Sequence, residues 1–158
     1  MEENINESLS RLGRRILEMA RNELYIHMRF LDVALSSFLY EPDPSIRCVA
    51  TDGIHMFYHP VMLGNVFQKN RIWVNRSYLH MVLHCILHHV TRRGKREKTL
   101  WNLSCDIAVE SIIDHWYLKC VHFPQTRLRK DTYGQLSKAM KVLTAEGIYR
   151  QLAGWNLP

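Results

Sequence analysis

Four histidines lie close together in the chain and are the residues best suited to carry chemistry: His80, His84, His88 and His89. The first three are four residues apart, so on a helix they lie along one stripe. Histidines one turn apart have Cβ atoms about 5–6 Å apart, and both imidazoles can reach one zinc ion at about 2.0–2.1 Å. The spacing therefore predicts metal binding by His84 and His88, with ordinary polar positions on a buried helix as the alternative.

Zinc peptidases use this spacing in the motif HExxH, whose glutamate takes a proton from the metal-bound water. The segment from His84 to His88 has the ligand spacing but lacks that glutamate. His80 is open to two interpretations, a fourth ligand or partner of a ligand and a partly exposed structural histidine, of which the second is simpler. His89 points off the stripe and is expected to pair with an acidic side chain.

A second periodic group follows, in which Asp106, Glu110 and Asp114 also recur every four residues. A zinc site takes a third protein ligand from another element, and a carboxylate is suitable. If the two helices form a hairpin, this acidic stripe can face the histidine stripe. A solvated acidic face is the competing interpretation, and the pattern alone does not decide between the two.

The elements that must hold these residues are mostly helical. Apolar residues recur at helical spacing over residues 5–38, and the prolines in 41–44 end that pattern. Strands at 46–50 and 54–58 around the turn 51–53 predict a hairpin. Further helices are expected at 61–68 and at 144–153. Two longer helices are expected between them, one from a cap at Asn75 or Ser77 to about Val90 and one from Leu100 or Trp101 to about Leu118. The segment 119–134 is expected to be irregular. This layout predicts an α+β fold, predominantly helical, with a small β-hairpin.

The composition is typical of one folded domain, expected to span 1–158 with a flexible N-terminus at 1–4. Of the 158 residues, 47% are hydrophobic and 23% charged, unlike a disordered chain. No apolar run approaches the roughly 20 residues that a membrane helix needs, and residues 1–10 are too polar for a secretory signal. The four cysteines form no CxxC pair, which is typical of reduced thiols. We therefore expect a cytoplasmic protein without a membrane partner.

The net charge of +6 favours an acidic partner such as nucleic acid. Much of the excess lies in the basic loop, residues 92–98, which contains no aromatic side chain for stacking on bases. A solvated loop between helices is the favoured interpretation. Nucleic-acid binding through this loop, together with Arg127, Arg129 and Lys130, remains an alternative.

Several segments resemble, in order and spacing, the metallopeptidase domain that precedes a von Willebrand A-like domain in many bacterial proteins. They are Thr51-Asp52-Gly53 with His59-Pro60, residues 83–89, Arg92-Arg93, residues 100–110 with Trp101-Asn102, and residues 143–149. That family typically has an HExxH helix, an arginine after it, a Trp-Asn pair and an Ala-x-Asp-x-x-x-Asn helix. The resemblance covers residues 10–152 and implies a zincin-like helical domain.

The resemblance also implies a site and partners. Residue by residue, His84 and His88 match the two histidine ligands, and Asp106 matches the aspartate expected as the third. Zinc is the preferred ion, because two imidazoles and a carboxylate suit it. An ATPase and a von Willebrand A-like protein are the implied partners.

Three residues depart from the family pattern. Cys85 stands where the general-base glutamate belongs, Glu110 where asparagine is usual, and His59 where asparagine precedes the proline. A thiol cannot replace a carboxylate that shuttles protons at neutral pH. The resulting hypothesis is a catalytically impaired metallopeptidase-like domain that binds zinc and acts as a binding or regulatory module. The alternatives are a zinc-dependent hydrolase with Glu110 as a displaced base, a nucleic-acid-binding domain, and a helical domain without metal.

Overall fold

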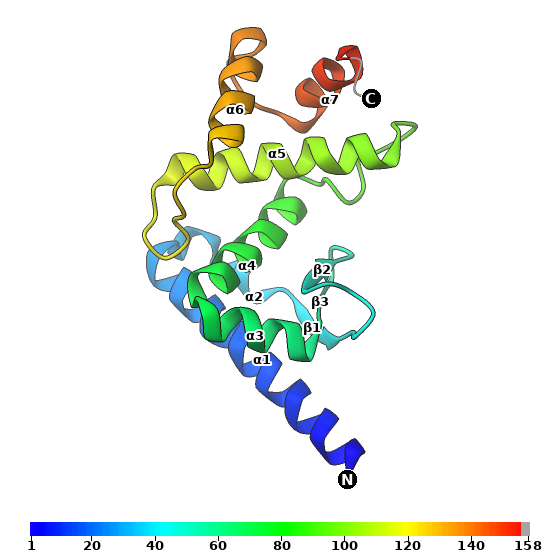
Figure 1. Ribbon diagram of the computed structural model, residues 1–158, viewed down its shortest axis with the longest axis vertical. Coiled ribbons are helices and arrows are strands. Elements are labelled where there is room, and N and C mark those ends of the chain that lie inside the picture. Colours follow the sequence, from blue (N-terminus) through cyan, green and yellow to red (C-terminus); the bar gives the residue numbers. More distant parts are fainter. Residues whose placement is uncertain (156–158) are drawn as a thin grey trace.

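The computed structural model describes residues 1–155 and confirms a predominantly helical α+β fold (Figure 1). Over these residues the elements are α1 (Glu2–His27), the short 3₁₀ helix η1 (Arg29–Leu31), α2 (Asp32–Ser36), β1 (Leu39–Pro42), β2 (Val49–Thr51), β3 (His55–Tyr58), α3 (Pro60–Lys69), α4 (Arg71–Ile86), α5 (Lys98–Trp116), α6 (Arg127–Ala139) and α7 (Ala145–Gly154). None of the helices in this part of the chain has the length and apolarity required to span a membrane.

The strands form one three-stranded sheet in the order β1-β3-β2. β2 and β3 pair antiparallel, with Ala50 opposite Phe57, which confirms the expected hairpin. β1 adds a third strand, parallel to β3, that the sequence pattern did not predict. Pro42 is compatible with this strand because β1 lies at an edge, where a missing N–H donor breaks no ladder.

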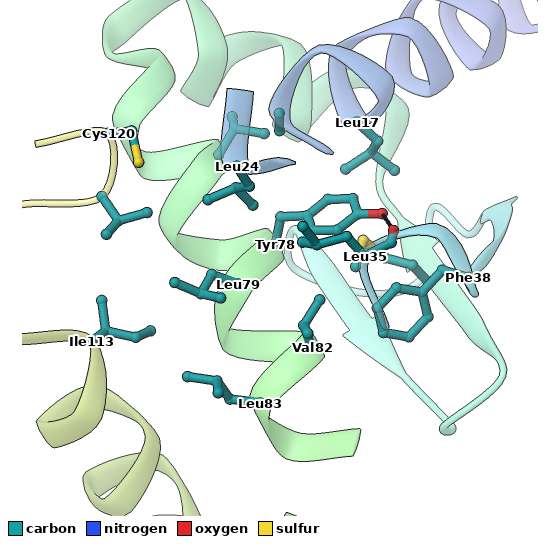
Figure 2. Close-up of a cluster of buried hydrophobic side chains, with 14 of the residues drawn as sticks. Leu17, Leu24, Leu35, Phe38, Tyr78, Leu79, Val82, Leu83, Ile113 and Cys120 are labelled. Carbon is teal, nitrogen blue, oxygen red and sulfur yellow. Dashed lines mark hydrogen bonds between the residues drawn. The ribbon is translucent and has the colours of Figure 1, made fainter. Parts of the chain in front are cut away.

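The main hydrophobic core is built around α4 (Figure 2). Tyr78, Leu79, Val82 and Leu83 of α4 are buried, and they pack against apolar side chains of α1, α2 and α5. The hydroxyl of Tyr78 donates a hydrogen bond to the Leu35 carbonyl at 2.6 Å, so no polar atom of this ring is left without a partner in the core. With one face of α4 fixed in this core, the face that carries the histidines is held in a defined direction.

A second apolar cluster joins α5 to the last two helices. Trp101, Cys105 and Ala108 of α5 pack there with Leu136 of α6 and with apolar residues of α7. α5 also contributes Val109 and Ile113 to the main core. In Figure 1, α5 accordingly runs between the α6–α7 pair and the rest of the molecule. Because α5 is held on two sides, its acidic stripe has little freedom to move relative to α4.

Local capping explains where the two site helices begin. The side chain of Asn70 accepts a hydrogen bond from the Ile72 amide at 3.0 Å, so α4 starts at Arg71. The expected cap Asn75 instead lies inside the helix, where its buried amide donates to the Cys120 carbonyl at 3.0 Å. Glu97 caps α5 by accepting from two backbone amides, and Thr144 caps α7 as expected.

The remaining difference concerns the segment 119–134. α1 begins at Glu2, and the expected flexibility of residues 1–4 stays a prediction. The segment expected to be irregular contains the start of α6, which follows a cap at Thr126. Most residues of α6 are polar and only Leu136 is buried, so the segment offers few apolar residues from which a helix could be predicted.

Candidate metal centre

The two histidines that converge in the structure are one turn earlier than the predicted pair. His80 and His84 lie on α4, and their Nε2 atoms are 2.8 Å apart. Asp106 approaches from α5, with its Oδ1 3.3 Å from His80 Nε2 and 3.2 Å from His84 Nε2. Three potential ligand atoms from two helices therefore form a nearly equilateral triangle.

The size of this triangle fits a tetrahedral zinc ion. With bonds of about 2.0–2.1 Å, neighbouring ligands in a tetrahedron are about 3.3 Å apart, close to the three distances observed. Two imidazoles and one carboxylate also match the ligand chemistry that zinc prefers. The side chain of Asp106 is 55% exposed, so the group is open to solvent on one side. Three protein ligands would leave a fourth position for water or a ligand.

Glu110 orients the ring of His80. Its Oε1 lies 2.7 Å from His80 Nδ1, and an ionised carboxylate can only accept a hydrogen bond. The ring proton is therefore held on Nδ1, and Nε2 is directed toward His84 and Asp106. Such a carboxylate behind a ligating histidine fixes its tautomer and raises its basicity.

His89 occupies the corresponding position behind His84. Their Nδ1 atoms are 3.1 Å apart, and the carbonyl of His89 accepts a hydrogen bond from the Trp101 indole at 3.2 Å. Burial and the neighbouring His84 lower the pKa of His89 to about 4, so its ring is neutral at physiological pH. A neutral ring can accept the Nδ1 proton of His84, which leaves His84 Nε2 free to bind a cation.

The end of α4 explains why His88 is not part of the group. The helix, expected to reach about Val90, ends at Ile86, and His88 has a left-handed backbone with φ of 57°. The amides of His88 and His89 donate to the carbonyls of Cys85 and His84, the hydrogen-bond pattern of a Schellman motif. This reversal leaves His88 exposed and brings His89 back against His84.

In neither histidine pair does a glutamate directly follow the first histidine. In the converging pair the residue after the first histidine is Met81, whose thioether has no proton to exchange. Cys85 is half-buried, its Sγ lies 3.9 Å from the Thr51 hydroxyl, and burial raises the pKa of its thiol. The thiol is therefore protonated at neutral pH and is poorly suited to act as a base.

A buried charge network supports the centre from behind. Arg76 of α4 hydrogen-bonds Glu110 and donates to Asp114 at 2.7 Å. Arg129 of α6 donates to the same two carboxylates, at 2.7 Å to Glu110 and 2.6 Å to Asp114, and the Tyr133 hydroxyl donates to Asp114 at 3.0 Å. The sequence offered two interpretations of the acidic stripe, facing the histidines or facing solvent. Asp106 faces the histidines, whereas Asp114 does neither and is buried among arginines.

The charges of the centre depend on one another. Burial disfavours charge on His80, but hydrogen bonds to Asp106 and Glu110 outweigh it and raise the pKa of His80 to about 9. Burial likewise opposes the charge of Glu110, yet hydrogen bonds from His80 and Arg76 lower its pKa to about 2. The pKa of Asp106 is lowered well below its ordinary value by the same two histidines that it faces, against the effect of burial. Without a metal ion, His80 is therefore positively charged at neutral pH.

A cleft of about 630 Å³ opens beside the centre. Its lining includes His84, Asp106 and Met81, together with residues of the edge strand β2. His89 and Trp101 also contribute to this lining. A ligand in the cleft can therefore reach the group of ligand atoms directly.

Sequence reasoning selected His84 and Asp106, which the structure brings together, and it selected His88 and Glu110, which do not join the triangle. For His80 the sequence leaves two interpretations and favours the structural one, although its spacing from His84 is the same as that of His88. A histidine at position 88 is the one available signal that the helix ends before it, because histidine, like asparagine and aspartate, is enriched among residues with a left-handed backbone.

Comparison with known proteins assigns the chain to a family. A family model described as "Putative metallopeptidase domain" matches residues 14–156. No match is found among curated proteins or among solved structures. The matched region contains all the elements that form the candidate centre, from most of α1 to α7. The chain therefore belongs to the family that this model describes.

Proposed function

We propose that this domain binds one divalent metal ion, preferably zinc, through His80, His84 and Asp106, and that it holds peptide ligands rather than hydrolysing them by the usual peptidase route. The observation that carries the proposal is the triangle of ligand atoms with edges of 2.8, 3.2 and 3.3 Å. Bound zinc would supply a Lewis acid that polarises a carbonyl or binds a carboxylate at its fourth position.

The residues around the centre favour binding over catalysis. HExxH peptidases need a glutamate beside the first histidine, and Met81 has that place in the converging pair. The neighbouring His89 is neutral, buried and hydrogen-bonded to His84, so it keeps a ring in position instead of exchanging protons with water. The cleft beside the centre retains room for a ligand.

The experiment that tests this function combines metal analysis with a peptidase assay. Protein purified without a histidine tag or chelator is expected to contain about one zinc per chain and to leave a mixed peptide library uncleaved. Loss of the zinc is expected to abolish binding of metal-directed probes such as hydroxamates. A preparation that binds no zinc, even when zinc is supplied in excess, would refute the proposal.

Glu110 is the residue that separates this function from an active hydrolase. Both of its oxygens accept hydrogen bonds, one from His80 and the other from Arg76 and Arg129, which supports a positioning role. Glu110→Gln keeps an acceptor for His80 but loses the charge, so we expect zinc affinity to fall about tenfold, and about 100-fold in Glu110→Ala. Competition with a fluorescent zinc chelator measures both. If Glu110 were the displaced base, Glu110→Gln would abolish hydrolysis and leave zinc affinity unchanged.

Zinc binding is expected to depend on pH through His80. Its pKa of about 9 in the folded, metal-free protein means that zinc must displace a proton below that pH. Apparent zinc affinity should therefore rise about tenfold per pH unit between about pH 7 and 9. The same raised pKa stabilises the metal-free protein below the ordinary histidine pKa of 6.5, and this contribution is lost as the pH rises through 9. Chelator competition and thermal unfolding over this range measure both effects, and a flat affinity would contradict the charge state of His80.

The partners implied by the family resemblance, an ATPase and a von Willebrand A-like protein, stay predictions. A peptide-holding metal domain is compatible with such an assembly, because a domain without its own base can still recruit a chain for another subunit. Co-purification with zinc-loaded protein and with His84→Ala would test whether the metal centre takes part in any such contact.

A further inference from the structure

The basic loop contributes two cations to the cleft beside the metal centre. Arg93 and Lys98 line the cleft, and both are exposed. Within residues 1–155 neither forms an ion pair with a carboxylate. Among the described residues that line the cleft, the one carboxylate is that of Asp106, whose charge a bound cation would offset. The cleft therefore offers two cations close to the metal centre that form no ion pair with its described lining, although Glu97 of the same loop interacts electrostatically with Arg93.

Two other basic residues of the loop, Arg92 and Arg96, have structural partners. Arg92 lies 3.4 Å from the Glu146 carboxylate of α7. The guanidinium of Arg96 lies over the rings of Trp101 and Tyr149, at 4.8 and 5.8 Å from their centroids, and donates to the carbonyls of Arg92 and Arg93. These contacts fix the course of the loop, and Arg93 itself donates to the Arg96 carbonyl at 3.4 Å, which holds its guanidinium beside the cleft.

The rest of the lining suits a peptide better than a nucleic acid. Residues Val49–Thr51 come from β2, an edge strand whose outer side has no strand partner among the described residues. An edge strand offers backbone donors and acceptors that an extended chain can use. The tryptophan in the lining, Trp101, is only 1% exposed, so it offers no ring face on which a base could stack.

We infer that Arg93 and Lys98 form an anion-recognition subsite, which selects peptide ligands that carry a carboxylate next to the segment lying at the metal centre. The carboxylate belongs either to an aspartate or glutamate side chain or to a free C-terminus, since both present the same two oxygens to a guanidinium and an ammonium. The two residues determine specificity and take no part in metal binding. This inference rests on the proposed function, because it places the peptide in the cleft of that centre.

The test measures the binding of matched peptides by fluorescence anisotropy. Four labelled hexapeptides share a background of glycine, alanine and serine. Three have an amidated C-terminus and carry glutamate, glutamine or lysine at one central position. The fourth carries the central glutamine and has a free C-terminus. We expect one of the two carboxylate peptides to bind about tenfold more tightly than the amidated glutamine peptide, and the lysine peptide to bind most weakly. The preference should shrink between about 20 mM and about 500 mM salt, because both cations are exposed.

Three variants locate the effect. Arg93→Gln and Lys98→Gln are each expected to reduce the carboxylate preference about threefold to fivefold, and the double variant to remove it. Lys95→Gln is the matched control, because Lys95 is an exposed cation of the same loop that does not line the cleft, and it should keep the full preference. An equal loss in Lys95→Gln would show general charge attraction and overturn the inference.

Further outcomes separate the subsite from the metal centre. If His80→Ala, without zinc, binds every peptide more weakly but keeps the ratio of affinities between the preferred carboxylate peptide and the amidated glutamine peptide, both proposals hold. If parent and His80→Ala bind equally and the ratio persists, the metal function fails and the subsite stands. Equal affinity for all four peptides, no binding of any of them, or a single-stranded oligonucleotide that displaces the glutamate peptide at far lower concentration would each overturn the subsite.

Discussion

His80→Ala and His84→Ala are each expected to lower zinc affinity by more than about 100-fold. That loss exceeds the effect of removing an outer hydrogen-bonding partner, because a ligand itself disappears. His80 is the more informative of the two, since the family resemblance implies His84 and His88 as the ligands, and the structure instead groups His80 with His84. Calorimetric zinc titration of each variant, after unfolding curves show that it is folded, measures the loss.

His88→Gly is the matched control for these variants. His88 has a left-handed backbone at the end of α4, where glycine is the preferred residue. The change should therefore keep zinc affinity at the parent level and raise the free energy of unfolding by about 1 kcal/mol. Loss of zinc in His88→Gly, together with retained zinc in His80→Ala, would instead support the ligand set implied by the resemblance.

Arg76→Ala is expected to cause the largest loss of stability, about 3–5 kcal/mol in the free energy of unfolding. Arg76 is buried, and it pairs with Glu110 and Asp114 while donating to the Val121 carbonyl at 3.0 Å. Without Arg76, the two carboxylates would share the guanidinium of Arg129, and the Val121 carbonyl would lose its donor. Removing one member of a buried ion-pair network costs far more than the network contributes net. Urea unfolding of the zinc-free proteins measures the difference.

Arg71→Ala controls for the loss of an arginine from the same helix. Arg71 is exposed and lies 3.7 Å from the Glu23 carboxylate, a surface pair expected to contribute less than about 1 kcal/mol. Parent-like stability in Arg71→Ala together with a loss below about 1 kcal/mol in Arg76→Ala would contradict the account of the buried network. Arg76→Ala should also weaken zinc binding, because Glu110 would lose a hydrogen bond that holds it behind His80.

The helical stripe of histidines could be predicted from the sequence, but its register could not. His80, His84 and His88 have equal spacing, so periodicity gives two overlapping pairs and no reason to choose between them. The choice depends on where α4 ends, and the Schellman motif that ends it at Ile86 contains neither glycine nor proline. Helix ends without such residues are the boundaries that sequence patterns locate least well.

For the acidic stripe too, the sequence predicts the spacing but not the role of each residue. Its spacing predicted a helix with three carboxylates on one face, and α5 has them. The different fates of Asp106 and Asp114 depend on Arg76 and Arg129, which come from two other helices. One of these helices, α6, was itself missed because most of its residues are polar. Contacts between elements far apart in the sequence set the role of each carboxylate, and periodicity within one element carries no information about them.

The central claim is that His80, His84 and Asp106 bind the metal, and anomalous diffraction at the zinc absorption edge tests it most directly. Crystals grown with zinc are expected to show one strong peak, about 2.0–2.2 Å from the Nε2 atoms of His80 and His84 and from a carboxylate oxygen of Asp106. Glu110 and His89 should lie behind the two rings, outside bonding distance of the ion. No peak at this group, or a peak bound by His88, would contradict the account.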